Sequence, residues 1–169
     1  LVRERQRDPL LTVHVVGGQD MADHPVVPIV DVLQDLVAEL DAKAVLVPSS
    51  ADGKEAAGRL AVRIGSGVIT DAVDINESGI ATQSVFGGST VVHSTVTHGV
   101  GIYAGRPNSV APAPAPTTCT VVDVDTTASE AAKTARVVER TVAGKGGRPE
   151  LTEAAVVVSG GRGVGGAEG

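Results

Sequence analysis

The sequence predicts an α/β fold with a partly parallel sheet, flanking helices and an antiparallel meander attached to the edge of that sheet. Short β-branched runs alternate with helical stripes between residues 10 and 67, as in βα units. Residues 68–104 then form short β-rich segments separated by glycines at hairpin spacing. Hydrophobic residues make up 42% of the 169 residues, which is enough to build a packed core.

The first elements alternate in type along the chain. Residues 10–16 are short and β-branched and end at Gly17-Gly18, so we expect a buried strand. Residues 28–40 repeat apolar side chains at spacings of three and four, which predicts a helix with Pro28 in its first turn. Residues 44–48 form a short apolar run, typical of a parallel strand covered on both faces.

A second helix is expected directly after that strand. Asp52 is predicted to cap it, and Glu55, three residues later, completes a pattern like a capping box. Gly65 and Gly67 are expected to end the helix. The apolar stripe between these ends consists of Ala57, Leu60, Ala61 and Ile64.

The remaining segments of the chain predict several different kinds of structure. Residues 111–116 alternate alanine and proline, which predicts an exposed polyproline II spacer. Residues 118–124 are a strand candidate, whereas residues 128–142 support both a helix and, in their second half, an extended segment that we favour. Residues 154–158 form an apolar run that predicts another strand. The expected meander comprises residues 68–75, 80–86, 90–96 and 101–104.

Composition excludes several classes of function. The 14 basic and 20 acidic residues give a net charge of −6 without a basic run, so neither nucleic acid nor an anionic membrane is an expected partner. Aromatic residues make up only 1%, which argues against stacking on bases. Cys119 is the one cysteine, so a disulfide framework and a multi-cysteine zinc site are excluded, and a reduced cytosolic setting fits. No segment reaches the roughly 18 apolar residues that span a bilayer.

Local motifs give no catalytic constellation. Residues 161–166 match G-x-G-x-x-G after an expected strand, but the dinucleotide fingerprint also needs a following helix and a later acidic residue. Cys119 is expected to be a small buried filler. Arg59 and Arg63, four residues apart, either meet a partner or solvate the outer helix face, and we favour solvation. The histidines, His14, His24, His93 and His98, lack the spacing of a metal site, and Ser84, Ser89 and Ser94 lack a nucleophile elbow.

Three stretches together resemble the alpha subunit of electron transfer flavoproteins. Residues 51–61 read Ala-Asp-Gly-Lys-Glu-Ala-Ala-Gly-Arg-Leu-Ala and run into Ile-Gly-Ser-Gly at 64–67 and Asp-Ala-Val at 71–73. Residues 86–88 read Phe-Gly-Gly. The most specific stretch is Arg-Pro-Glu-Leu-Thr-Glu-Ala at 148–154, followed by Val-Val-Val-Ser-Gly-Gly-Arg-Gly at 156–163.

The resemblance implies a noncatalytic electron carrier subunit. Such an alpha subunit pairs with a beta subunit, and the heterodimer carries electrons through FAD from acyl-CoA dehydrogenases of fatty acid beta-oxidation, and from other dehydrogenases, to the respiratory chain. A bacterial cytoplasmic location is the matching expectation. Arg162 matches a flavin-contacting arginine of the family, and Gly161 and Gly163 flank it. An always-charged guanidinium suits a phosphate or a reduced anionic flavin.

The resemblance also implies a domain organisation that is incomplete at both ends. Residues 1–142 correspond to the N-terminal α/β domain without its first strand–helix–strand unit, residues 143–153 to a linker, and residues 154–169 to the start of the FAD-binding domain. Most of the family's FAD-binding residues have no counterpart here, and one arginine cannot offset the cost of immobilising so large a cofactor. Two alternatives stay open: an adenine-nucleotide-binding α/β domain that uses residues 49–54 at a helix N-terminus, or an inactive structural remnant.

Overall fold

The computed structural model describes residues 11–114, 118–124, 127–141, 151, 154–161, 163 and 165. The chain divides into two units, Leu1–Val138 and Glu139–Gly169, and all regular elements of the described residues lie in the first. Of the linker expected at residues 143–153, only residue 151 is among the described residues.

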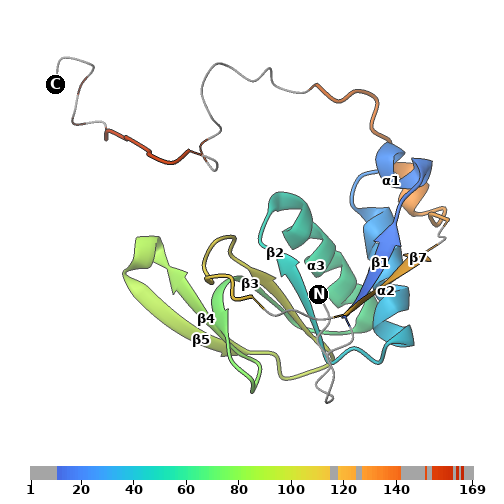
Figure 1. Ribbon diagram of the computed structural model, residues 1–169, viewed down its shortest axis with the longest axis horizontal. Coiled ribbons are helices and arrows are strands. Elements are labelled where there is room, and N and C mark those ends of the chain that lie inside the picture. The colour runs from blue at the N-terminus through green and yellow to red at the C-terminus, as the bar shows by residue number, and fades with distance from the viewer. Residues whose placement is uncertain are drawn as a thin grey trace. The chain divides into compact units, whose positions relative to one another are not determined.

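A five-stranded mixed sheet forms the centre of the first unit (Figure 1). Its strand order is β2-β6-β3-β4-β5, where β6 pairs in parallel with both of its neighbours and β3, β4 and β5 form an antiparallel meander. The predicted α/β class with a partly parallel sheet is therefore confirmed. The strands span Ala44–Pro48 (β2), Gly101–Gly105 (β6), Val68–Ile75 (β3), Ile80–Val85 (β4) and Thr90–Thr95 (β5).

The placement of β6 corrects one expectation. Residues 101–104 were expected to continue the meander, but β6 lies between β2 and β3. The glycines around this segment predict that the chain turns there, and they carry no information about which strand it joins. Pairing between strands far apart in the sequence decided its position.

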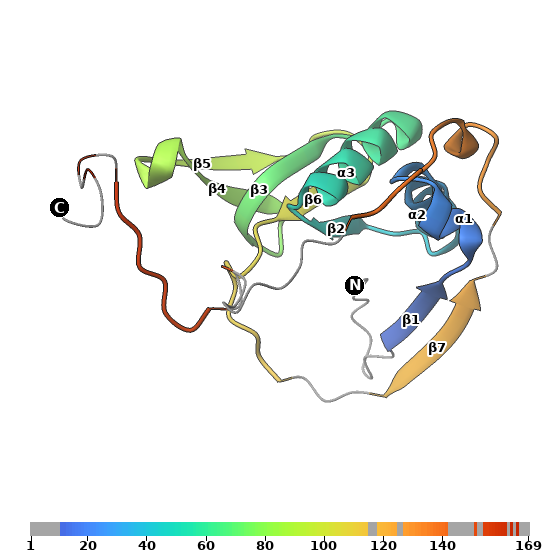
Figure 2. The same ribbon diagram turned by 90° about the horizontal axis from the view of Figure 1, so that it is seen from above.

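Two helices cover one face of this sheet, as Figure 2 shows. Helix α2 spans Val27–Glu39 and α3 spans Ala51–Ile64, close to the predicted ranges. Their buried side chains pack against β2 and β6 in the larger core cluster. Because neighbouring strand residues point to opposite faces, Ile102 belongs to this cluster, whereas Tyr103 joins a smaller cluster on the other face. The fully buried members of the larger cluster are Val30, Ala57, Leu60 and Ile102.

Strand β2 corrects a second expectation, that it would be covered on both faces. It is the last strand at one edge of the sheet, and Leu46 is 52% exposed. An apolar run predicts burial in a complete parallel sheet. In the described part of the chain the helices cover only the opposite face, so the side chain of Leu46 faces solvent.

A separate two-stranded parallel sheet contains β1 (Leu11–Val16) and β7 (Cys119–Val124), which confirms both predicted strands. The expectation of a buried first strand is wrong, since Val13 and Val15 are exposed. Cys119 is also exposed rather than a buried filler. A pair of strands offers too few neighbours to cover its own side chains. A short helix, α1 (Gln19–Asp23), follows β1.

The predicted ends of α3 are correct at one terminus only. Ser50, not Asp52, is the N-cap, because its side chain accepts a hydrogen bond from the Gly53 amide at 3.1 Å. Glu55 completes no capping box and pairs with Arg59 one turn later. Gly65 caps the C-terminus in the left-handed conformation, as predicted.

Two expected extended segments form no strand. Among residues 127–141 the only regular element is the 3-10 turn η2 (Ala132–Thr134), and residues 136–141 are irregular. Residues 154–158 are likewise irregular, with Val156 and Val158 exposed. β-branched residues favour extended backbone, but a strand also needs a neighbouring strand to pair with. Residues 111–114 are exposed, as expected for the spacer.

Candidate functional site

The glycine-rich stretch after residue 158 is the expected flavin contact. Arg162 lies outside the described residues, while Gly161 and Gly163 are described and exposed. A Cβ built on either glycine would meet no atom within 4 Å. Neither glycine is therefore required by a close neighbour within its own unit.

The loop after β2 is the second place that the sequence singled out. Ser49 Oγ donates to Asp71 Oδ1 at 2.8 Å, and Lys54 Nζ lies 2.9 Å from Asp71 Oδ2. Asp71 sits in β3 with a φ of 56°, where the pairing register of that strand shifts. The hydrogen bond from Lys54, followed by that from Ser49, lowers the pKa of Asp71 below its ordinary value. These contacts fasten the start of α3 to β3.

The hydrogen-bond donors of this loop are already engaged by other residues of the chain. Ser50 caps the Gly53 amide, and the Lys54 ammonium is paired with Asp71. A Cβ on Gly53 would lie 2.0 Å from the Pro48 carbonyl oxygen, so this glycine allows α3 to approach the end of β2. A phosphate-binding loop would instead present amides and a lysine to a ligand. The geometry therefore does not favour the nucleotide-binding alternative.

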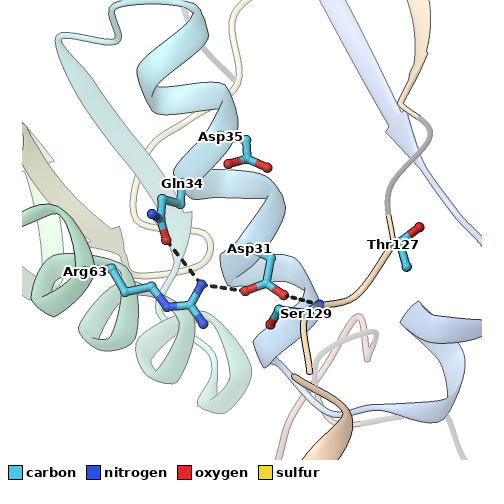
Figure 3. A pocket seen from close by; sticks show the side chains of 6 residues that line it. All are labelled: Asp31, Gln34, Asp35, Arg63, Thr127 and Ser129. Atoms are coloured by element: carbon cyan, nitrogen blue, oxygen red, sulfur yellow. Dashed lines mark hydrogen bonds and ion pairs between the residues drawn. The ribbon is translucent and has the colours of Figure 1, made fainter. Parts of the chain in front are cut away.

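A polar pocket of about 400 Å³ lies between α2, α3 and the segment that precedes η2 (Figure 3). Arg63 Nη1 donates to Asp31 Oδ1 at 2.5 Å and to Gln34 Oε1 at 3.3 Å. The backbone amide of Ser129 donates to Asp31 Oδ2 at 3.1 Å. The lining residues are Asp31, Gln34, Asp35, Arg63, Thr127 and Ser129.

The pocket is a junction of three segments rather than a set of free functional groups. Burial alone would raise the pKa of Asp31, but the hydrogen bonds from Arg63 and Ser129 outweigh it and lower the pKa. Arg63 was expected to solvate the helix face, and it is instead engaged by α2. No local signal predicts this contact, because Asp31 and Arg63 are 32 residues apart. Arg59 pairs with Glu55 on its own helix.

The histidines are scattered over different elements. His24 Nδ1 lies 2.7 Å from the Ala135 carbonyl oxygen, and His93 Nδ1 lies 3.2 Å from Thr82 Oγ1. Both ring nitrogens of His14 are buried without a hydrogen-bond partner among the described residues. In the part of the chain that the structure describes, no three His, Cys, Asp or Glu side chains gather as metal ligands, and no helix has the length and apolarity to cross a bilayer.

Comparison with known proteins decides the family. A sequence model described as "Electron transfer flavoprotein domain" matches residues 10–145. This chain belongs to the electron transfer flavoprotein family. It is 42% identical over 154 residues to the electron transfer flavoprotein subunit alpha of Mycobacterium leprae strain TN, a match that covers 90% of this chain and 48% of that protein.

Two other electron transfer flavoprotein subunits match this chain in a similar way. The subunit alpha of Mycobacterium tuberculosis strain H37Rv is 43% identical over 154 residues, which cover 90% of this chain and 48% of the relative. That of Syntrophomonas wolfei is 32% identical over 172 residues, which cover 93% of this chain and 50% of the relative. The chain thus spans about half the length of the curated relatives it matches.

Proposed function

We propose that this chain is the scaffold and subunit-binding part of an electron transfer flavoprotein alpha subunit. One observation carries the proposal: the family match over residues 10–145 coincides with 42–43% identity to mycobacterial alpha subunits. The described geometry agrees with a scaffold role, since Asp31 and Asp71 each join separate segments of the fold.

In this proposal the chain carries out no catalysis of its own. It pairs with the beta subunit in the bacterial cytoplasm, and the heterodimer passes electrons from acyl-CoA and other dehydrogenases towards the respiratory chain. The name of each relative, subunit alpha, supports a protein that is built from more than one kind of subunit.

FAD is the cofactor of the proposed assembly. Arg162, Gly161 and Gly163 are the residues of this chain that would contact it, and a guanidinium there would stabilise negative charge on phosphate or reduced flavin. One arginine cannot offset the cost of immobilising so large a cofactor, so we expect the chain alone to hold no flavin. Residues 1–142 are the proposed α/β domain, 143–153 the linker and 154–169 the start of the FAD-binding domain.

The free edge of β2 supports a further part of this proposal, an additional strand–helix–strand unit beside it. β2 pairs with β6 on one side only, and no described strand pairs with its other side. Leu46 is exposed on the uncovered face. Parallel strands are normally covered on both faces, so this edge is suited to a further parallel strand.

Co-expression with the beta subunit from the same genome tests the proposed function. We expect the untagged beta subunit to co-purify with the tagged chain in equal amount, and the tagged chain expressed alone to show no visible flavin absorbance. An unrelated tagged α/β protein serves as the control for nonspecific capture. A beta subunit that stays in the flow-through would overturn the pairing, and stoichiometric flavin on the lone chain would overturn the proposed division of the cofactor site.

A further inference from the structure

We propose that residues 127–138 form a releasable strap. The strap is fastened to helices α1 and α2 mainly by polar contacts, and it detaches as one piece while the rest of the first unit stays folded. Its release adds up to about 40 Å of extended chain to the connection with the second unit, which begins at Glu139. The inference does not depend on the proposed function, because every contact that carries it lies within the first unit.

The first end of the strap is held by carboxylates of both helices. The Ala128 amide donates to Asp20 Oδ2 at 3.0 Å. The neighbouring Ser129 amide donates to Asp31 Oδ2 at 3.1 Å, as Figure 3 shows. Because Asp20 lies in α1 and Asp31 in α2, two consecutive amides of the strap bridge the two helices. The turn η2 follows, where the Ala132 amide donates to Ser129 Oγ at 3.2 Å.

The second end of the strap is held at the C-terminal end of α1. The Val137 amide donates to the Asp23 carbonyl oxygen at 2.7 Å, and His24 Nδ1 donates to the Ala135 carbonyl oxygen at 2.7 Å. Between these two contacts, Arg136 Nη2 lies 3.6 Å from Asp23 Oδ2. The last residue of α1 and its C-cap therefore hold three consecutive residues of the strap.

Little apolar burial supports these contacts. The buried residues of the strap are two alanines, Ala128 and Ala132, and neither belongs to a core cluster of the sheet. Val138, at the end of the strap, is 95% exposed. A segment with few buried apolar contacts and exposed hydrogen bonds opens locally at a lower free energy than the whole fold. The strap can therefore detach while the cluster around Leu60 and Ile102 stays packed.

Limited digestion with trypsin measures the release, because cleavage sites lie inside the strap, beyond it and in the core. Lys133 and Arg136 are the strap sites, Arg140 lies just beyond the strap, and Arg59 lies within α3. Cleavage of folded backbone follows the population of the open form. Fragments are quantified by mass spectrometry, and each rate is divided by the rate of the same site in a short synthetic peptide. In the wild-type chain we expect cleavage after Arg140 to be about 10-fold faster than at the strap sites, and cleavage after Arg59 to be slower than at both.

One variant weakens each end of the strap. Asp20→Ala removes the acceptor of the Ala128 amide, and we expect cleavage at both strap sites to become about 10-fold faster while cleavage after Arg140 is unchanged. Asp52→Ala is the matched control, because Asp52 also lies in the first turn of a helix but is exposed and forms no hydrogen bond or ion pair among the described residues. This control is expected to be cleaved at the wild-type rates.

The other end is tested in the same way. His24→Ala removes the donor to the Ala135 carbonyl oxygen, and cleavage at both strap sites is again expected to accelerate. His98→Ala is its control, because the His98 side chain is exposed and forms no hydrogen bond within the described part of the chain. In the double variant Asp20→Ala/His24→Ala the two accelerations should multiply, since both contacts close the same strap.

Three outcomes would overturn the strap. A wild-type chain cut at the strap sites as fast as after Arg140 would have no closed strap, and one cut there as slowly as after Arg59 would release it only on global unfolding. If Asp20→Ala accelerated cleavage after Lys133 alone, the two ends would open separately, which contradicts release as one piece.

Discussion

At the residue scale, Asp31 makes contacts that stabilise the junction between α2, α3 and the segment before η2. Its side chain is 13% exposed and accepts hydrogen bonds from Arg63 and from the Ser129 amide. A carboxylate so placed has its charged form stabilised in the folded state, which agrees with the lowered pKa. The stability that it contributes is therefore present above its ordinary pKa of 3.8 and is lost as the pH falls through the folded value.

The predicted consequence is a pH-dependent loss of stability in Asp31→Asn. At neutral pH the variant should lose about 1–2 kcal/mol of unfolding free energy, since a charge-assisted hydrogen bond becomes a neutral one. Urea denaturation measures this loss. On acidification below pH 3.8 the difference from the wild type should shrink, because the carboxylate of the unfolded chain is protonated first and that of the folded chain only at lower pH.

Asp35→Asn is the matched control, because Asp35 lines the same pocket on the same helix but is exposed and forms no hydrogen bond or ion pair among the described residues. Its unfolding free energy should stay within about 0.5 kcal/mol of the wild type. A loss in Asp31→Asn that is no larger than this, or one that persists unchanged at acidic pH, would show that the Arg63 contact contributes nothing measurable.

At the scale of elements, α3 contains two glycines with opposite roles. Gly53 lies in the first turn, where a Cβ would meet the Pro48 carbonyl oxygen at 2.0 Å. Gly58 lies in the helix interior, and a Cβ there meets nothing within 4 Å. The same substitution at the two positions should therefore have effects of opposite sign.

Gly53→Ala is expected to lower the unfolding free energy by about 1–3 kcal/mol, because β2 and α3 must move apart. Gly58→Ala should raise it by about 0.5–1 kcal/mol, because alanine is the better helix former. Chemical denaturation of both variants beside the wild type is the measurement. Equal effects at the two sites would contradict the close packing of α3 on the end of β2.

The elements that the sequence predicted well are those with local causes. The apolar periodicity of residues 28–40 predicted α2, and Gly65 predicted the end of α3. The choice of Ser50 over Asp52 as N-cap was not predictable, because both residue types cap helices. The position of β6 and the Asp71–Lys54 contact depend on pairing between distant segments, which no local pattern contains.

At the scale of the whole molecule, the five-stranded sheet has open strand edges and exposed faces that can bind other proteins. β2 and β5 are the two edge strands of the five-stranded sheet, and each carries an exposed apolar residue, Leu46 and Val91 respectively. The proposed function involves further protein of two kinds, the rest of an alpha subunit and the beta subunit. We propose that the first joins at β2, a parallel edge.

The candidate flavin contact shows the limit of sequence reasoning at this scale. The Ser-Gly-Gly-Arg-Gly motif suggested a cofactor residue, Arg162, which lies outside the described residues, so this expectation stays a prediction. A cofactor site needs several segments brought together, and a motif supplies only one of them. The central claim therefore concerns the proposed binding of the beta subunit.

Size-exclusion chromatography with light scattering, on an equimolar mixture of the purified chain and purified beta subunit, tests that claim most directly. A single peak with the summed mass of one chain and one beta subunit is the predicted result. Two peaks that keep the masses of the separate proteins, at concentrations where both are folded, would contradict it.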